Sequence, residues 1–325
     1  MKSMTRTLTR APWSLACLLA IAMTARAEMF QVPPSGVDLI GLEEKTVAEY
    51  EDTLPDIARR FGLGFEEIAL ANPGTDPWLP GAGKPITLPT QHILPPGPRE
   101  GIVINLADHR LYYFPRPTGK EPAELISHPI SVGQMDWRTP IGVTEIVAKV
   151  RNPTWYPPAS IRKQHEDDGD PIPAAIPPGP DNPLGEYAMR LGIPGGGYMI
   201  HGTNKPVGVG LQVTHGCIRM YPEDIESLFR VIKVGTKVRI INQAVKTGWN
   251  QGVLYLEVHP LLENSGATPV DLTELTRILV AATRARPVRI NWPLAERALR
   301  EARGMPVAVS SPQHTLEART SSTDQ

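Results

Sequence analysis

The chain begins with a long apolar run and then alternates between helical and strand-like patterns. Residues 11–25 are almost continuously apolar, follow a basic start, and end in the small residues Ala25-Arg26-Ala27. This order is typical of a secretory signal peptide with its cleavage site. We therefore predict that residues 1–27 are an export signal that is cleaved after Ala27.

Two alternatives for this segment are an uncleaved membrane anchor and a lipoprotein modified at Cys17. Fifteen apolar-type residues fall short of the roughly 18 or more that span a bilayer. The sequence Ser14-Leu15-Ala16-Cys17 is a poor lipobox, and almost no hydrophobic region precedes it. A cleaved signal is therefore the favoured prediction.

Residues 44–89 carry two short helical patterns between two strand-like ends. Thr53 and Asp56, three residues apart, can cap the first helix. The second helix stops at Asn72-Pro73-Gly74. These patterns predict a compact βααβ unit, whose elements fall near residues 45–50, 54–61, 65–70 and 86–88.

Strand patterns dominate residues 101–242, which follow a proline-rich stretch at residues 90–100 that reads as a stiff linker. Residues 101–106 and 110–114 are two strand runs joined by a short turn, which predicts a hairpin. This part is therefore predicted to be a mostly β domain. Further strands are expected at residues 126–132, 143–150, 198–201 and 237–241.

A proline-rich stretch at residues 152–185, with the acidic run Glu166-Asp167-Asp168, interrupts this domain. A loop of more than about 15 residues inside a compact domain is usually functional or disordered. The stretch is either a lid or groove wall for a substrate or a decorated surface loop, and the sequence leaves both open. A short helix that opens at Pro222 is expected after it.

The pattern changes again in a C-terminal appendage predicted at residues 250–304. A strand at residues 253–258 precedes two helices that begin near Asp271 and Asn291. Its role is not evident from the sequence. Residues 305–325 are rich in serine and threonine, which predicts a disordered tail.

Composition and charge exclude several classes of protein. Of 325 residues, 41% are hydrophobic and 21% charged, which is typical of a soluble globular protein rather than a disordered or membrane-embedded one. After loss of the signal the net charge is near −5, because the signal contains four basic residues and no acid. Without a basic cluster the mature chain is not expected to bind nucleic acid.

The candidate chemistry lies in the segment Thr214-His215-Gly216-Cys217. Its last residue, Cys217, comes sixteen residues after His201. Cys217 is the single thiol of the mature chain. A free thiol is mostly protonated at neutral pH and needs a neighbouring base, which His201 can supply if an acceptor fixes its tautomer. Gly216 allows close approach of a substrate carbonyl, so the amides around it can form an oxyanion hole. Together these features indicate acyl transfer through a thioester.

Three alternatives compete with this interpretation. His201, His215 and Cys217 are suitable zinc ligands, but a fourth ligand at familiar spacing is missing. Cys217 can also be a buried apolar filler with its histidines satisfied in the core. The last alternative is redox sensing, for which no resolving cysteine is present.

The segment from His201 to Arg219 resembles the signature of the YkuD-type L,D-transpeptidases, a His-Gly pair followed by Ser/Thr-His-Gly-Cys. The similarity covers about residues 101–242. The gap after His201 is shorter than in the broad family, and Arg219 stands where asparagine is frequent. Both features resemble the periplasmic subgroup of Gram-negative bacteria.

Residues 44–89 resemble the LysM module, a βααβ fold that binds glycan chains of the N-acetylglucosamine type. The residues usually found before the first helix, Gly-Asp, are replaced here by Glu51-Asp52. A structural module that binds no glycan is the alternative. The resemblance rests on Thr53-Leu54, Ile57-Ala58-Arg59-Arg60-Phe61, Ile68, Ala71-Asn72-Pro73-Gly74 and Leu88-Pro89.

The family resemblance implies a YkuD-like β-sandwich and a cysteine nucleophile. Cys217 would attack the diamino-acid carbonyl of a peptidoglycan tetrapeptide stem, with release of D-Ala. His201 would be the base, the Gly202 carbonyl its orienting group, and the amides of His215, Gly216 and Cys217 the oxyanion hole. No metal or cofactor is implied, and carbapenem acylation of the cysteine is expected.

The resemblance also implies substrate contacts, a compartment and an acceptor. We expect the enzyme in the periplasm, with an outer-membrane lipoprotein lysine as acceptor. The alternatives are 3–3 cross-linking of stems, hydrolysis of the stem or lipoprotein linkage, and a non-catalytic cell-wall binding protein. Arg219 is expected either to bind a substrate carboxylate or to be paired structurally. The remaining candidate groove residues are Tyr198, Met199, Thr203 and Thr214.

Overall fold

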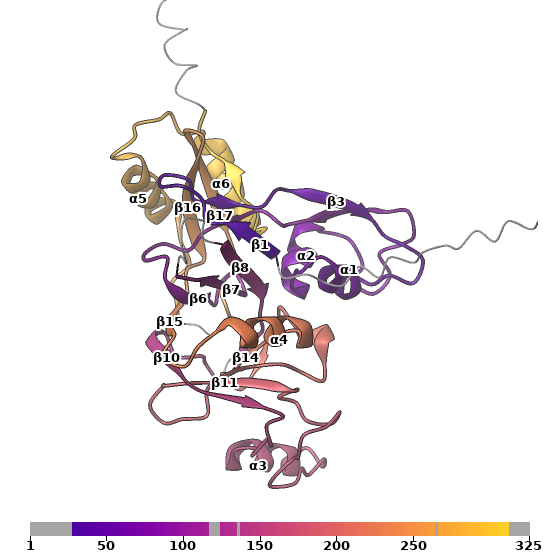
Figure 1. Ribbon diagram of the computed structural model, residues 1–325. Helices are drawn as coiled ribbons and strands as arrows, with labels where there is room; N and C mark the ends of the chain where they lie inside the picture. Colours follow the sequence, from indigo (N-terminus) through magenta and orange to yellow (C-terminus); the bar gives the residue numbers. More distant parts are fainter. Residues whose placement is uncertain (1–27, 117–123, 135–136, 264–265, 312–325) are drawn as a thin grey trace, which may run out of the picture.

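The computed structural model describes residues 28–116, 124–134, 137–263 and 266–311. A nine-stranded sheet lies below a C-terminal unit that contains α5 and α6, and a small module that contains helices α1 and α2 lies beside it (Figure 1). The predicted signal at residues 1–27 lies outside the described residues. No helix among the described residues has the length and apolar character needed to cross a membrane.

The nine-stranded sheet has the order β1-β8-β7-β6-β15-β10-β11-β12-β14. Neighbours are antiparallel except for the pairs β6–β15 and β12–β14, which are parallel. The predicted hairpin is confirmed as β6 and β7. The strands are β1 (Glu28–Gln31), β6 (Gly101–Asn105), β7 (Arg110–Phe114), β8 (Glu124–Pro129), β10 (Gly142–Arg151), β11 (Tyr187–Leu191), β12 (Met199–His201), β14 (Ile218–Arg219) and β15 (Lys237–Ile241).

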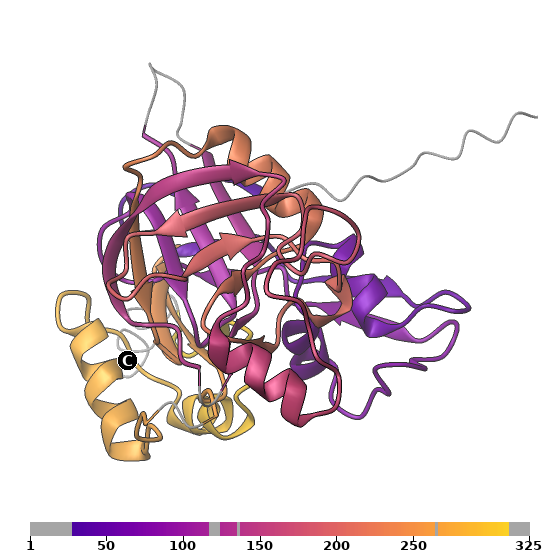
Figure 2. The ribbon, with the colours of Figure 1, turned by 90° about the horizontal axis from the view of Figure 1, so that it is seen from below.

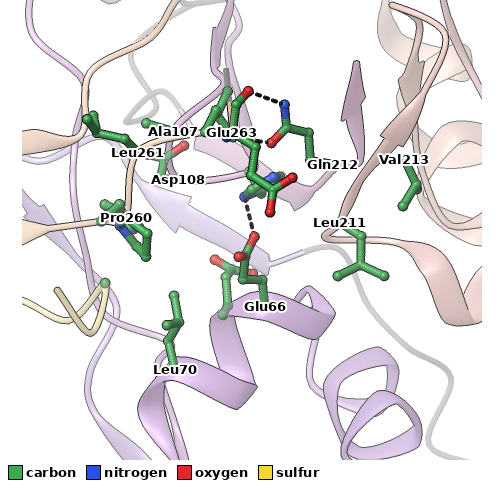
Figure 3. Close-up of a pocket in the computed structure, with 15 residues that line it drawn as sticks. Glu66, Leu70, Ala107, Asp108, Leu211, Gln212, Val213, Pro260, Leu261 and Glu263 are labelled. Carbon is green, nitrogen blue, oxygen red and sulfur yellow. Dashed lines mark hydrogen bonds and ion pairs between the residues drawn. The ribbon is translucent and has the colours of Figure 1, made fainter. Parts of the chain in front are cut away.

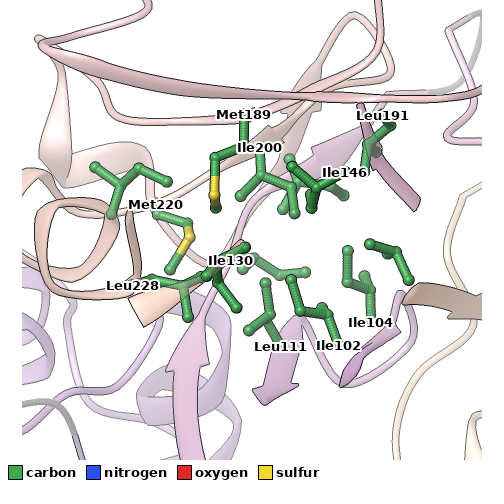
Figure 4. Packing of buried hydrophobic residues seen from close by; sticks show 14 of the residues in the cluster. Ile102, Ile104, Leu111, Ile130, Ile146, Met189, Leu191, Ile200, Met220 and Leu228 are labelled. Atoms are coloured by element: carbon green, nitrogen blue, oxygen red, sulfur yellow. The ribbon is translucent and has the colours of Figure 1, made fainter. Parts of the chain in front are cut away.

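The sheet curls because strand β10 takes part in both of its halves. Residues 142–145 of β10 pair with β15, whereas residues 146–151 pair with β11, with a shift of register between Ile146 and Ala148. The two halves therefore face each other around one core (Figure 2). In Figure 4, Ile102, Ile104 and Leu111 from one half lie opposite Met189 and Ile200 from the other. The mostly β domain predicted from the sequence is confirmed.

Helix α4 (Pro222–Val231) closes one side of this core. Pro222 occupies its first turn, where a missing N–H group costs nothing. Ile225 and Leu228, three residues apart, are fully buried and belong to the same hydrophobic cluster as the sheet. The helix expected from the sequence is therefore present, and it fixes the segment that follows β14.

The small module has the order β3 (Glu44–Val47), α1 (Leu54–Arg60), α2 (Phe65–Ala71) and β4 (Pro85–Leu88). The Thr53 hydroxyl accepts a bond from the Asp56 amide, and the Asp56 carboxylate accepts one from the Thr53 amide, as a capping box requires. A hydrophobic cluster of its own fills the module. The βααβ order agrees with the sequence pattern, whereas the LysM assignment itself remains a prediction.

The module is docked on the sheet domain by a buried ion pair. Glu67 of α2 lies 2.9 Å from Arg110 of β7, and both side chains are buried. The α2 backbone adds a bond from the Phe65 amide to the Val209 carbonyl. The stretch at residues 90–100 was predicted to be a stiff linker, but it contains strand β5 (His92–Ile93), whose two residues are buried. The linker prediction is wrong because β5 pairs with β2 (Leu39–Ile40) and the Ile93 amide donates to Glu257, which hold this stretch against the rest of the molecule.

The C-terminal unit is larger than predicted at both ends. Strand β16 (Val245–Asn250) precedes the expected β17 (Val253–Val258) and pairs with it. Strand β18 (Val307–Ala308) pairs with β17 on the other side, so residues 305–311 do not belong to a disordered tail as predicted. Val309 is fully buried, which explains the order, and residues 312–325 lie outside the described residues. The predicted helices are α5 (Leu272–Thr283) and α6 (Trp292–Glu301).

The remaining short elements connect these parts. The loop predicted at residues 152–185 contains a helix, α3 (Ala159–Asp167), that the proline content had concealed. Strand β2 (Leu39–Ile40) pairs with β5. Strands β9 (Val132–Gly133) and β13 (Gln212–Thr214) form a parallel pair next to the short helix η1 (Pro206–Gly208).

Candidate active site

The predicted catalytic residues meet at the edge of the curled sheet. His201 is the last residue of β12, and Cys217 comes immediately before β14. These strands are parallel neighbours, with Ile200 opposite Ile218 and His201 opposite Arg219. Residues sixteen positions apart in the sequence are therefore held close together, one at the end of β12 and the other immediately before β14.

His201 is held in one tautomer by the backbone. Its Nδ1 lies 2.6 Å from the Gly202 carbonyl oxygen. A carbonyl can only accept, so Nδ1 carries the proton and Nε2 carries the lone pair. Burial, reinforced by the nearby positive charge of Arg219, lowers the pKa of His201 to about 4, against the opposing bond to Gly202. The imidazole is therefore neutral at neutral pH and has the lone pair of a base.

Cys217 is a free thiol that remains protonated in this environment. Burial raises the pKa of Cys217 above its usual value, although a backbone hydrogen bond from Met199 and the charge of Arg219 act in the opposite direction. The thiol donates to the Gly197 carbonyl over 3.4 Å. The site thus combines a neutral thiol with a neutral imidazole, an arrangement in which a nucleophilic thiol needs a base to remove its proton.

Gly216 occupies a position that excludes a side chain. Its φ is +92°, in the region that favours glycine, and a Cβ there would lie 2.9 Å from Cε1 of Tyr198. The Thr139 hydroxyl donates to the Gly216 carbonyl over 3.0 Å and accepts from the Gly133 amide. The catalytic loop is therefore fixed by contacts on both faces.

A cavity of about 1000 Å³ lies beside His201 and Cys217. Four other candidates from the sequence also line it: Met199, Thr203, Thr214 and Arg219. His215 lines it as well, with Nε2 3.4 Å from Oε1 of Gln164 on α3. Gly202, Gly216 and Tyr198 are not among the lining residues.

The loop at residues 152–185 forms one wall of this cavity. Trp155, Tyr156 and Ile161 line it together with proline residues of the same loop. Asn182 is fully buried and its amide donates to the Pro153 carbonyl over 2.8 Å, which ties the two ends of the loop together. Of the two alternatives for this loop, the structure favours a groove wall.

Arg219 lines the cavity and has a fixed backbone. Its amide and carbonyl both bond to Ser131, at 3.1 and 2.8 Å. Nε is buried and has no hydrogen-bond partner among the described residues. Burial lowers the pKa of Arg219, while Cys217 raises it. The residue thus places a poorly solvated positive group beside the thiol.

The comparisons with known proteins agree with this site. Residues 99–240 match the family model described as the L,D-transpeptidase catalytic domain. Probable L,D-transpeptidase YcfS of Escherichia coli is 42% identical over 262 residues, which cover 79% of this chain and 81% of the relative. Probable L,D-transpeptidase ErfK/SrfK of Salmonella typhimurium is 37% identical over 305 residues, 90% of this chain and 95% of the relative. This chain belongs to the L,D-transpeptidase family.

Solved structures match more weakly than these relatives. The catalytic domain of the Enterococcus faecium L,D-transpeptidase is 22% identical, with a TM-score of 0.32, and the match covers 44% of this chain and 96% of that one. The sequence relatives therefore establish the membership of this L,D-transpeptidase in its family.

The zinc alternative for the site gains no support. Among the described residues, one group of acidic and histidine side chains is close enough to share a metal, namely Asp108, Glu257 and His259, away from Cys217. The Lys246 ammonium lies 2.7 Å from both Asp108 and Glu257 and forms an ion pair with each. A metal ion does not fit there without displacing that ammonium.

The sequence analysis missed several residues of this L,D-transpeptidase that shape the site. Thr139 fixes the catalytic loop, and Arg190 of β11 and Lys205 add positive charge to the cavity. Strand β11 was not predicted, although Tyr187, Met189 and Leu191 alternate toward the core as a strand requires. That alternation was the available signal, and the neighbouring prolines concealed it.

Proposed function

We propose that this enzyme transfers acyl groups of peptidoglycan tetrapeptide stems through a thioester on Cys217. The observation that carries the proposal is the His201 tautomer, which leaves Nε2 unprotonated on a strand adjacent to the thiol. Membership of the L,D-transpeptidase family supports the same substrate class.

In the first half-reaction, Nε2 of His201 accepts the thiol proton while Sγ of Cys217 attacks the diamino-acid carbonyl of the stem. The amides of His215, Gly216 and Cys217 donate to the oxyanion. The C–N bond then breaks, and His201 returns the proton to the leaving amine of D-Ala. Carbonyl carbon and sulfur remain joined as a thioester.

In the second half-reaction an acceptor amine attacks the thioester. His201 takes one proton from this amine, the C–S bond breaks, and the proton returns to Cys217. Amide bonds are exchanged without oxidation or reduction, so the cycle needs no cofactor. The neutral state of both side chains at rest makes this shuttle symmetrical.

The cavity supports recognition of an acidic peptide. Arg219 and Arg190 line it with Lys205, and peptidoglycan stems carry free carboxylates. We assign Arg219 to a substrate carboxylate, because it lines the cavity beside Cys217. Met199, Thr203 and Thr214 contact the remainder of the stem, and Tyr198 holds the loop in place.

We propose an outer-membrane lipoprotein lysine as the acceptor and the periplasm as the compartment. The signal prediction for residues 1–27 and the Gram-negative relatives support export. The module at residues 44–89 would hold the glycan strand while the catalytic domain acts on its stem. Cross-linking of a second stem, and hydrolysis by water, use the same acyl-enzyme.

The acceptor is tested on mature protein loaded with a disaccharide tetrapeptide. A lysine-ended lipoprotein peptide, a second stem and buffer alone are added to separate samples, and the products are identified by mass spectrometry. Faster discharge by the lysine peptide is expected. Discharge by the second stem alone would assign 3–3 cross-linking, and equal rates in buffer would assign a hydrolase.

A further inference from the structure

The segment that leads to Cys217 is held by the small module as well as by the catalytic domain. Residues 205–213, the bridging loop, lead from the end of β12 to the catalytic loop at residues 214–217. The Phe65 amide at the start of α2 donates to the Val209 carbonyl over 2.9 Å. The first amides of a helix have no partner inside the helix, so the bridging loop supplies an acceptor that α2 needs.

Gly64 and Gly210 fix the distance between the module and the bridging loop. A Cβ on Gly64 would lie 2.8 Å from the Gly210 Cα, and a Cβ on Gly210 would lie 2.5 Å from the Gly64 Cα. Backbone atoms cannot move aside as the end of a flexible side chain can. The φ of Gly64 is −88°, which alanine also adopts. The contact, and not the backbone conformation, therefore excludes a side chain at Gly64.

A second anchor of the bridging loop lies beyond this contact. There, Leu70 of α2 and Leu211 of the bridging loop line a cavity of about 230 Å³ (Figure 3). Figure 3 also shows two hydrogen bonds between Gln212 and Glu263. The Gln212 amide group donates to the Glu263 carbonyl over 3.2 Å and accepts from the Glu263 amide over 3.0 Å. The loop is therefore held by the module at Gly210 and by a residue after β17 at Gln212.

Ser131 connects the bridging loop to the strand that follows Cys217. Its hydroxyl donates to the Gly208 carbonyl over 2.7 Å. Its amide and carbonyl bond to the Arg219 backbone at 2.8 and 3.1 Å, and the residue is fully buried. One residue thus joins the bridging loop to β14, which begins directly after Cys217.

The module also contacts the chain just after β14. The Tyr221 hydroxyl donates to the carbonyl of Leu63, the neighbour of Gly64, over 3.1 Å. Arg59 of α1 donates twice to the Glu223 carboxylate in the first turn of α4, over 2.7 and 2.8 Å. The module therefore holds the chain on both sides of the catalytic loop.

We propose that the small module is a positioning element of the active site, which sets the placement of Cys217 against His201. It acts through the backbone contact of Gly64 with Gly210 and through Ser131. None of these three residues is among those that line the cavity beside Cys217, so they are positioning residues rather than catalytic ones. The inference rests on the proposed thioester chemistry of Cys217 and does not require the module to bind glycan.

The test is acylation of mature protein by a disaccharide tetrapeptide over a range of donor concentrations, followed by intact-protein mass spectrometry. Gly64→Ala adds one methyl group against Gly210. The bridging loop must shift, so the limiting acylation rate at saturating donor should fall at least tenfold. The fraction of protein finally labelled should stay complete, because loss of folded protein lowers that fraction, whereas a misplaced thiol lowers the rate. Circular dichroism checks that the variant is folded.

The matched control is Gly83→Ala, which makes the same change in the same module. Nothing lies within 4 Å of the added atom at Gly83. Its limiting rate should stay within twofold of the wild type. A fall in Gly64→Ala that is matched by an equal loss of labelled protein would overturn the inference, because the contact would then serve stability alone.

Ser131→Ala tests the connection from the side of the catalytic domain. It keeps the backbone bonds to Arg219 and removes the bond to the Gly208 carbonyl, so the limiting rate should fall at least about threefold. Because both changes act on one loop, the double variant with Gly64→Ala should lose less than the product of the two single losses. Losses that multiply, or a wild-type rate in folded Gly64→Ala, would overturn the inference. Absence of any adduct in the wild type would contradict the proposed function, and this inference with it.

Discussion

At the residue scale, the proposed mechanism depends on a histidine that is kept neutral and on a glycine at a position with no room for a side chain. The bond from Nδ1 to the Gly202 carbonyl takes the orienting role that a carboxylate has in many catalytic triads. Without a carboxylate partner to stabilise the positive charge, the buried His201 imidazole stays neutral before the reaction. This choice sets the pH range in which the enzyme can work.

The pKa of His201, about 4, predicts the acid limb of the pH profile. Nε2 accepts a proton from the thiol only while the imidazole is neutral, so the acylation rate should be flat from pH 8 to 5 and fall as the pH drops through 4. Acylation by a carbapenem, followed by intact-mass spectrometry, measures this rate. Circular dichroism at each pH separates loss of the base from unfolding. An apparent pKa between 6 and 7 would show that the ring is charged more easily than this structure implies.

Gly216→Ala tests the fit of the catalytic loop. The added methyl group would lie 2.9 Å from Tyr198, at a φ of +92°. The loop must shift, so acylation should fall at least a hundredfold, the loss typical of a misplaced oxyanion donor. Gly235→Ala is the control, since its φ of +84° is similarly strained but nothing lies within 4 Å of the added atom. Near-normal rates in Gly216→Ala would show that the loop tolerates the shift.

At the scale of elements, sequence patterns predicted what is local and missed what depends on distant partners. Thr53 and Asp56 predict the start of α1, because the two residues of the capping box lie within four positions of each other. The burial of His92 and Ile93 could not be anticipated, since the Ile93 amide donates to Glu257, 164 residues away. Cys217 and His201 were predicted from their residue types. The contact of Thr139 with the Gly216 carbonyl was missed, because the two residues are 77 positions apart.

The docking of α2 on β7 yields a prediction about stability. Glu67 accepts both from Arg110 and from the Gly64 amide that starts its own helix. Glu67→Ala should lower the free energy of unfolding by about 3–5 kcal/mol, because it leaves a buried guanidinium without its carboxylate. Glu223→Ala, which breaks the half-exposed pair with Arg59, should cost less than about 1 kcal/mol. Urea unfolding measures both, and equal costs would contradict a central role for the buried pair.

At the scale of the whole molecule, Lys246 connects parts that are distant in the sequence. Its ammonium lies between Asp108 of the β6–β7 turn and Glu257 of β17, and all three side chains are buried. Burial opposes the charge, but Asp108 and Glu257 raise the pKa of Lys246 well above its usual value. The C-terminal unit is thereby joined to the catalytic domain through this buried cluster of ion pairs. No sequence motif predicts the cluster, because its residues lie far apart in the chain.

Lys246→Met should uncouple these parts. Two buried carboxylates would lose their cation, at a cost of about 3–5 kcal/mol. We expect the wild type to unfold in one calorimetric transition and the variant to show an earlier, separate transition of the C-terminal unit. Limited proteolysis should then cleave near residues 242–246 in the variant first. A single transition with unchanged midpoint would show that the cluster does not couple the domains.

The central claim is that Cys217 carries the acyl group during transfer. Mature protein is mixed with a disaccharide tetrapeptide, quenched in acid and analysed by intact-protein mass spectrometry. Its mass should increase by the mass of the donor less that of D-Ala. The adduct should map to Cys217 after digestion and be absent in Cys217→Ala protein that keeps its circular dichroism spectrum. Release of D-Ala by the alanine variant at the wild-type rate would contradict the account.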